Sequence, residues 1–172
     1  MIEIERKFLV LRRTRALPEG GSIIEQGYLT SSEPTVRVRI MDERGYLNIK
    51  TPRLPSGTKL EGIAALVARA EYEYSIPAHD AGELMKLCVW RLLKTRYELD
   101  GGFELDVFGG TLSGLEILEY ESDDIDAMPH IPEWLEVREV TGNPLFNNIR
   151  LAMEGIPSAL ADGRIGKVAL GD

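Results

Sequence analysis

Side chains of alternating character recur in short segments along the first 122 residues of the chain. In residues 2–10, one phase carries Glu3, Glu5 and Lys7, while the other carries apolar side chains and one arginine. Alternation with period two is typical of β-strands, because successive side chains of a strand point to opposite faces. The pattern predicts strands over these ranges: 2–10, 23–30, 35–42, 46–51, 69–77, 92–100, 103–110 and 115–122.

Two links between these segments are short enough to form β-hairpins. Residues 42–45 (DERG) connect the third strand to the fourth, and residues 100–102 (DGG) connect the sixth to the seventh. We expect glycine to supply the unusual backbone angles of both turns. The sheet is therefore predicted to be antiparallel.

Helical signals are fewer than strand signals. Asp80 is a candidate N-cap for a helix over residues 81–90, and Asp123 for a short one over residues 125–128. Asn143 followed by Pro144 predicts the start of a helix over residues 144–155, with Gly155 as its stop. The Pro-, Gly- and Ser-rich residues 53–64 predict a loop.

Composition narrows the classes of partner. The chain carries a formal net charge of −8, whereas binders of nucleic acids or membrane surfaces usually carry a basic excess, so neither partner is expected. An acidic balance is suited instead to metal cations. Cys88 is the only cysteine, which excludes an intramolecular disulfide. No apolar run is long enough to span a bilayer and no leader pattern is present, so a cytoplasmic location is predicted.

The phase of each predicted strand that lacks large apolar side chains is almost entirely charged. The opposite phase, which includes Ile4, Val38, Tyr72, Tyr74 and Leu105, is predicted to face a core. Bases occur together on some strands and acids on others. The charged phase holds eight acids and six bases: Glu3, Glu5, Lys7, Arg37, Arg39, Lys50, Glu71, Glu73, Lys94, Arg96, Glu104, Asp106, Glu119 and Glu121.

Two arrangements accommodate these charges. An antiparallel sheet with one face in water is the simpler, but such faces usually mix in many uncharged polar residues and alternate opposite charges. Closing eight strands into a barrel would instead enclose the charged phase and turn the apolar phase outward, under helices. Enclosed charges are costly unless ligands neutralise them. A chain of phosphates would satisfy the bases, and hard divalent cations the acids.

Several motifs occur in a fixed order along the chain. An ExExK pattern is formed by Glu3, Glu5 and Lys7, and the series continues to about residue 155. It runs through QGYL (26–29), VRVRI (36–40), NIK (48–50), EYEY (71–74), KTRY (94–97), FELDVF (103–108), GTLSGLEILEYE (110–121) and EVTGNP (139–144). In this order the sequence resembles the CYTH domain proteins, also called triphosphate tunnel metalloenzymes. Residues 1–155 are expected to form that domain, and residues 156–172 a peripheral tail.

The resemblance implies an α+β fold, namely an eight-stranded antiparallel β-barrel that forms a tunnel, with a few covering helices. It implies action on triphosphates with Mg²⁺ or Mn²⁺, and we expect two ions. Catalytic roles are expected for Glu5, Lys7 and Lys94, and supporting roles for Glu71 and Glu73. The phosphates would be bound by Lys7, Arg37, Arg39, Lys50, Lys94 and Arg96. Metal ions would be bound by Glu3, Glu5, Glu104, Asp106, Glu119 and Glu121.

One stretch departs from the family pattern. A basic residue and a tyrosine commonly follow EVTG in the family, whereas this chain has Leu145 and Phe146. The departure puts in question how one end of the tunnel is capped. Asn148 and Arg150 are candidate polar substitutes.

The predicted function is metal-dependent hydrolysis of inorganic triphosphate to pyrophosphate and phosphate. Class IV adenylyl cyclase and thiamine triphosphatase are alternatives that would use the same tunnel. Low aromatic content and no recognisable adenine pocket favour the small substrate over both. A non-catalytic polyphosphate-binding module is the alternative from another class, although the paired acids would be of no use to it. A homodimer is compatible with the outward apolar residues.

Overall fold

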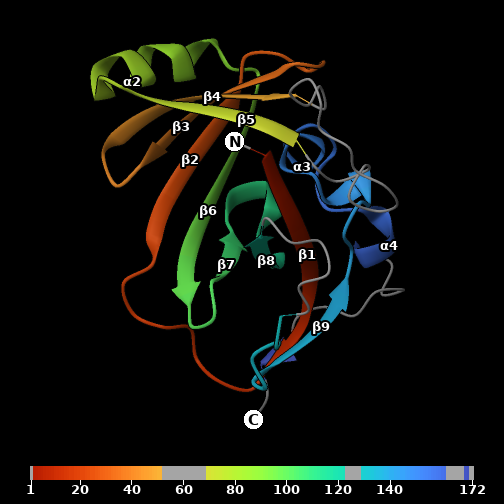
Figure 1. Cartoon of the computed structure of the whole chain (residues 1–172). Helices are drawn as coiled ribbons and strands as arrows, with labels where there is room; N and C mark the ends of the chain where they lie inside the picture. Colours follow the sequence, from red (N-terminus) through yellow and green to blue (C-terminus); the bar gives the residue numbers. More distant parts are fainter. Residues whose placement is uncertain (1, 52–68, 123–128, 162–168, 171–172) are drawn as a thin grey trace.

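The computed structural model describes residues 2–51, 69–122, 129–161 and 169–170 (Figure 1). Its main feature is a ten-stranded sheet. The first strands are β1 (Ile2–Arg13), β2 (Ser22–Tyr28), β3 (Thr35–Met41), β4 (Arg44–Thr51) and β5 (Arg69–Ile76). They are followed by β6 (Trp90–Leu99), β7 (Phe103–Phe108), β8 (Glu116–Ser122), β9 (Leu135–Glu139) and β10 (Ala169–Leu170).

The first eight strands pair in a ring. The order is β1-β5-β4-β3-β2-β6-β7-β8, and β8 pairs again with β1, all antiparallel. The contact between β1 and β5 is confined to the pairs Ile2–Ala70 and Glu3–Arg69. This arrangement confirms the α+β class and the antiparallel, barrel-like sheet that the sequence predicts.

Strands β9 and β10 were not predicted from the sequence. Both pair with β1, β9 antiparallel along Phe8–Arg13 and β10 parallel at Arg12 and Arg13. Strand β1 is therefore longer than its predicted range, and a register shift between Val10 and Arg12 marks where its pairing becomes irregular. A strand as short as β9 carries too few residues for its alternation to stand out.

One of the two predicted turns has a different chemistry from that expected. Strand β3 is joined to β4 through Asp42 and Glu43, whose φ angles are 47° and 68°. Positive φ at both central residues is typical of a type I′ hairpin, and here no glycine supplies it. Gly45 lies inside β4 instead. In the other turn Gly101 and Gly102 have φ near 80°, as predicted.

Helix α2 (Ala78–Leu87) covers the outer face of β3 and β4. It begins after Pro77 and ends three residues before the predicted end, so Asp80 lies in its first turn and is not the N-cap. Gly45 is buried beneath it. The position has no room for a side chain, because a Cβ there would lie 2.6 Å from the Ala81 Cβ. Within the described residues, no helix has the length and apolar character needed to cross a membrane.

The helix predicted over residues 144–155 is divided in two. Asn143 caps a short 3₁₀ helix, η2 (Pro144–Phe146), by accepting a hydrogen bond from the Leu145 N–H. Asn147 is extended, and α3 (Asn148–Glu154) then runs to Gly155, whose φ of 80° stops it as predicted. A further 3₁₀ helix, η1 (Gly110–Leu112), follows β7, and α4 (Ser158–Ala161) follows α3. Residues 53–64 and 125–128 lie outside the described residues.

The apolar side chains form one cluster inside the ring and two outside it. Leu9, Leu92, Phe108 and Ile117 belong to the same strand phases as the charged residues, yet they are buried with Phe146 and Leu151. This inner cluster occupies the end of the ring next to η2 and α3. The outer clusters centre on Phe8, Phe103 and Leu105, and on the residues beneath α2. Tyr72 and Tyr74, predicted to face a core, are instead 45% and 56% exposed.

Candidate active site

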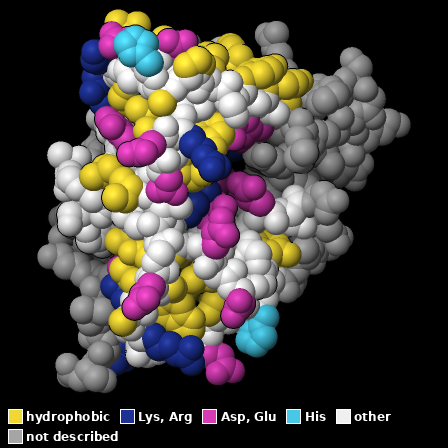
Figure 2. Space-filling model, turned by 90° about the vertical axis from the view of Figure 1, so that its left-hand side faces the viewer, with side chains coloured by type: hydrophobic (Ala, Val, Ile, Leu, Met, Phe, Trp, Pro, Cys, Tyr) yellow, Lys and Arg dark blue, Asp and Glu magenta, His cyan; other side chains and the backbone are white. Residues whose placement is uncertain are grey.

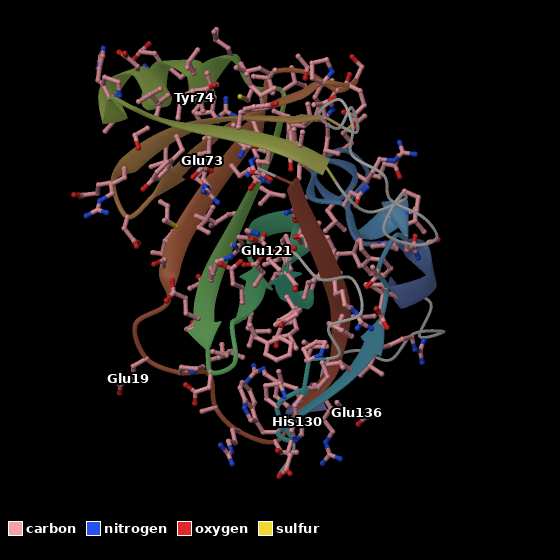
Figure 3. The ribbon with its side chains drawn as sticks, viewed as in Figure 1. Glu19, Glu73, Tyr74, Glu121, His130 and Glu136 are labelled. Atoms are coloured by element: carbon pink, nitrogen blue, oxygen red, sulfur yellow. The ribbon has the colours of Figure 1, made fainter. Side chains whose placement is uncertain are left out.

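A cavity of about 580 Å³ lies inside the ring of strands, next to the inner apolar cluster. On the face drawn in Figure 2, acidic and basic side chains lie side by side near the centre. In Figure 3, Glu121 lies near the middle of the ring, and Glu73 and Tyr74 lie on opposite faces of β5. The enclosed arrangement of the charged phase, not the wet sheet face, is therefore the one that this chain adopts.

Antiparallel register places bases opposite acids across neighbouring strands. Lys7 of β1 is opposite Glu119 of β8, and Lys50 of β4 is opposite Glu71 of β5. Arg96 of β6 is likewise opposite Asp106 of β7. Residues directly opposite on one face of an antiparallel pair are close enough for their side chains to interact. The sorting of acids and bases onto different strands thus produces ion pairs across the cavity wall.

The wall formed by β1, β6, β7 and β8 is one connected network. The Lys7 Nζ lies 2.5 Å from Glu119 Oε1 and 3.1 Å from Glu5 Oε2. The Arg96 guanidinium donates to both oxygens of Asp106 at 2.7 Å and to Glu119 Oε2 at 2.7 Å. It also pairs with Glu104, and Lys94 pairs with Asp106.

The opposite wall, formed by β3, β4 and β5, is paired in the same way. Arg37 binds Glu71 at 3.2 Å and Arg39 binds Glu73 at 2.6 Å. The Lys50 Nζ lies 2.7 Å from the other oxygen of Glu71. The buried amide of Asn48 donates to Glu71 and Glu73 and so links the two acids. The Nε–H groups of Arg37 and Arg39 are buried donors that have no partner among the described residues.

Burial and ion pairing oppose each other in setting the pKa values of this network. Burial alone would raise the pKa of Glu119, but Lys7, Lys94 and Arg96 hold it well below its ordinary value. Burial would lower the pKa of Lys7, yet Glu119 and Glu5 raise it. At Lys94 burial prevails, and its pKa is lowered despite the neighbouring Asp106. The pKa of Arg39 is lowered by burial and then by Arg37.

Two other acids of the cavity have a raised pKa, in contrast to Glu119. Burial raises the pKa of Glu121, and the nearby carboxylates of Glu5 and Glu104 raise it further. The pKa of Glu104 is raised mainly by burial, although Arg96 acts against it. The charged forms of these side chains are therefore disfavoured in the protein as it stands.

This acidic cluster is suited chemically to a divalent cation. Carboxylate oxygens are the donors that Mg²⁺ and Mn²⁺ prefer, and a cation beside Glu5, Glu104 and Glu121 would relieve their mutual repulsion. In the described part of the chain, no three acidic, histidine or cysteine side chains are already grouped to hold a metal ion. Asp106 and Glu119 each bind two bases, so metal binding by either would require an exchange of partners.

The cavity brings together nearly all of the site residues predicted from the sequence. Asp106 lies beneath the lining, fully buried under Lys94 and Arg96, and the Glu3 side chain lies outside the described part of the structure. The others line the cavity: Glu5, Lys7, Arg37, Arg39, Lys50, Glu71, Glu73, Lys94, Arg96, Glu104, Glu119 and Glu121.

Several lining residues were not predicted. Gln26 and Tyr28 reach the cavity from β2, and the Gln26 Nε2 donates to the Tyr28 hydroxyl at 2.5 Å. Burial raises the pKa of that hydroxyl to about 12. They share the inward phase of β2 with the apolar Ile24, so this phase does not stand out in the sequence as polar. Asn48, in contrast, is in phase with Lys50 and could have been predicted. The other lining residues that were not predicted are Glu33, Thr35, Gly142, Asn147 and Ile149.

The departure at residues 145 and 146 has a structural explanation. Phe146 is 1% exposed and belongs to the inner apolar cluster, so it closes one end of the ring by packing. Leu145 is exposed. Of the two polar substitutes considered, Asn148 lines the cavity, while Arg150 binds Glu154 one turn away on α3 and is not among the lining residues.

Comparison with known families accounts for this combination of ring, enclosed charges and ordered motifs. The CYTH domain family model matches residues 1–147. The chain belongs to the CYTH domain family. Its relatives include an inorganic triphosphatase of Acetivibrio thermocellus, 35% identical over 87% of this chain and 92% of the relative. An inorganic triphosphatase of Nitrosomonas europaea is 32% identical over 89% of this chain and 98% of the relative.

The fold is also shared with a solved structure. A crystal structure of an inorganic triphosphatase aligns with a TM-score of 0.57 and 30% sequence identity. The alignment covers 90% of this chain and 97% of that one. The likeness therefore extends over nearly the whole length of both proteins.

Proposed function

We propose that this CYTH protein hydrolyses inorganic triphosphate to pyrophosphate and phosphate. The observation that carries the proposal is the set of six basic side chains that line one enclosed cavity: Lys7, Arg37, Arg39, Lys50, Lys94 and Arg96. A site of this size lined by arginine and lysine is suited to a short chain of phosphates. The names of both relatives support the choice of substrate.

In this proposal the six bases bind and align the phosphates. Arginine donors contact phosphate oxygens in pairs, and the unpartnered Nε–H groups of Arg37 and Arg39 are available for that contact. Lys7 and Lys94 would stabilise the negative charge that develops during phosphoryl transfer, and Glu5 would orient the attacking water. Positioning and electrostatics supply most of the rate in such reactions. Glu71 and Glu73 would hold Arg37, Lys50 and Arg39 in place through the ion pairs described above.

Membership of this family implies dependence on a divalent cation, and charge balance supports it. The described lining has seven acids beside its six bases, so a triphosphate would bring several uncompensated negative charges. We propose two ions of Mg²⁺ or Mn²⁺, held by Glu3, Glu5, Glu104, Asp106, Glu119 and Glu121. Such ions, when bound, neutralise phosphate oxygens and lower the pKa of water.

A phosphate-release assay with inorganic triphosphate, ATP and thiamine triphosphate tests the proposal. Each substrate is supplied with Mg²⁺, with Mn²⁺ or with a chelator, and cyclic AMP is measured in the ATP reactions. We expect cation-dependent turnover that is fastest with inorganic triphosphate. Cyclic AMP formation would favour the cyclase alternative, and preference for thiamine triphosphate the other enzyme. Metal-independent polyphosphate binding without phosphate release would favour the binding module.

A further inference from the structure

Four groups on the side of β1 away from the cavity form a hydrogen-bonded chain that ends at Lys7. The Arg6 guanidinium donates to both oxygens of Glu139, with distances of 3.0 Å from Nε and 2.9 Å from Nη2. The Thr141 hydroxyl donates to Glu139 Oε1 at 2.7 Å and accepts from the Lys7 backbone N–H at 3.1 Å. A threonine hydroxyl has a single proton, and for Thr141 the Glu139 oxygen at 2.7 Å is a nearer acceptor than the Lys7 carbonyl at 3.4 Å.

The backbone of Lys7 is held on both of its polar groups by residues 140 and 141. The Val140 N–H donates to the Lys7 carbonyl at 2.8 Å, while the Lys7 N–H is bound by Thr141. The first contact continues the register of the β1–β9 pair one residue beyond the end of β9 at Glu139, whereas the second comes from a side chain. The Lys7 side chain then extends from this fixed backbone into the cavity, where it meets Glu119 and Glu5.

The segment after Thr141 also reaches the cavity. Gly142 is a lining residue, and after η2 the chain returns to the cavity at Asn147, Asn148 and Ile149. Thr141 therefore connects two parts of the site, the base Lys7 and the start of the segment that covers the cavity. Glu139 holds Thr141 by accepting a hydrogen bond from its hydroxyl, and Glu139 is itself held by the ion pair with Arg6.

We propose that Glu139 and Thr141 are positioning residues that set the placement of Lys7 and of residues 142–149 in the cavity. Glu139 and Thr141 are not among the cavity-lining residues, and they act on the site through the Lys7 backbone. The ion pair is partly exposed, with side-chain exposures of 14% for Arg6 and 42% for Glu139, so solvent weakens its contribution to overall stability. Displacement of a catalytic group by about 1 Å, in contrast, can cost about 10²-fold in rate.

Matched variants separate positioning from stability. Glu139→Gln and Thr141→Val remove the charge and the hydroxyl with little change in size, and Thr141→Ser keeps the hydroxyl. Glu83→Gln is the control, because it removes the same charge from an exposed ion pair with Lys86, at 2.6 Å on α2, which covers the outer face. For each variant the KM and kcat for inorganic triphosphate, its Kd by calorimetry and the Tm are measured.

We expect Glu139→Gln and Thr141→Val to raise KM and Kd about fivefold and to lower kcat/KM about tenfold, with Tm nearly unchanged. Thr141→Ser and Glu83→Gln should stay within about twofold of wild type. A merely structural role would lower Tm and kcat but leave KM and Kd unchanged, and that result would overturn the inference. So would a failure of Thr141→Ser to retain the wild-type values.

The kinetic part of this inference rests on the proposed function, and the same measurements keep the two apart. If the wild-type protein binds triphosphate but releases no phosphate, the proposed hydrolysis is wrong. The Kd values still decide the positioning role in that case, because the proposed contact of Lys7 with the phosphates does not depend on their cleavage. If the wild-type protein does not bind triphosphate at all, both proposals are wrong.

Discussion

At the scale of single residues, the depth of each base in the cavity wall decides what its removal should cost. Lys94 is 3% exposed and pairs with the fully buried Asp106, so its loss would leave a buried carboxylate with only Arg96 as partner. Breaking a buried pair in this way is strongly destabilising. Arg39 lies nearer the surface and pairs with the partly exposed Glu73. Removal of Arg39 should therefore lower activity with little loss of stability, whereas removal of Lys94 should lower both.

Replacing Arg39 by Ala is expected to lower kcat/KM for triphosphate by about tenfold or more, because one phosphate-aligning donor is lost. The Tm should fall only slightly. Arg150→Ala is the control, since Arg150 binds Glu154 on the exposed side of α3 and does not line the cavity. Steady-state phosphate release and thermal melting check both variants. Equal activity of the two would mean that Arg39 has no part in the reaction.

At the scale of elements, helix α2 lies against the ring only because two strand positions lack side chains. A Cβ at Gly27 of β2 would lie 2.7 Å from Cys88 Cβ, and one at Gly45 of β4 would lie 2.6 Å from Ala81 Cβ. Contacts this short require the helix to move outward. Gly82 of α2 itself has open space around its Cβ position.

Gly45→Ala should therefore destabilise the protein by about 1–3 kcal/mol, because the added methyl group overpacks the contact with α2. Gly82→Ala places the same methyl group in the helix without a clash and should stabilise it by about 0.5–1 kcal/mol. Chemical denaturation at equilibrium measures both changes. Destabilisation by both substitutions to the same extent would show that the close approach of α2 is not the cause.

At the scale of the whole molecule, the ring concentrates acids that bound metal ions are expected to neutralise. Glu121 illustrates the consequence. Its pKa is raised by burial and by Glu5 and Glu104, so its charged form is less stable in the folded protein than in the unfolded chain. The penalty is present above the raised pKa. It disappears as pH falls through that value, because the folded protein then takes up the proton first.

Glu121→Gln is accordingly expected to raise Tm near neutral pH, and the gain should shrink as pH falls toward the ordinary glutamate value of 4.5. Added Mg²⁺ should raise the Tm of the wild-type protein more than that of the variant, since one carboxylate of the proposed metal site is gone. Thermal melting over a pH series, with and without Mg²⁺, measures both effects. A Tm gain that grows as pH falls would contradict the direction of the pKa shift.

The strands and the inward set of charges could be predicted from the sequence because period-two alternation is a local property. Glu5, Lys7, Arg96 and Glu119 are identified by the phase they occupy, and the order of motifs indicated the family. The backbone geometry of the turn at Asp42 and Glu43 could not be predicted, because a sequence shows residue preferences and not the φ angles that the chain adopts.

The features that could not be predicted from the sequence depend on contacts between distant segments. Only closure of the ring through the β1–β8 pair brings Lys7 to Glu119, and only the tertiary fold places Phe146 in an apolar cluster at one end. Strand β9 pairs with residues of β1 that lie more than 120 positions earlier in the chain. The bonds of Glu139 with Arg6 and of Thr141 with the Lys7 backbone join residues 133 and 134 positions apart. By itself the sequence determined which faces are charged and which are apolar. The tertiary structure decided which charges meet, because pairing across strands is set by register and by the order of strands around the ring.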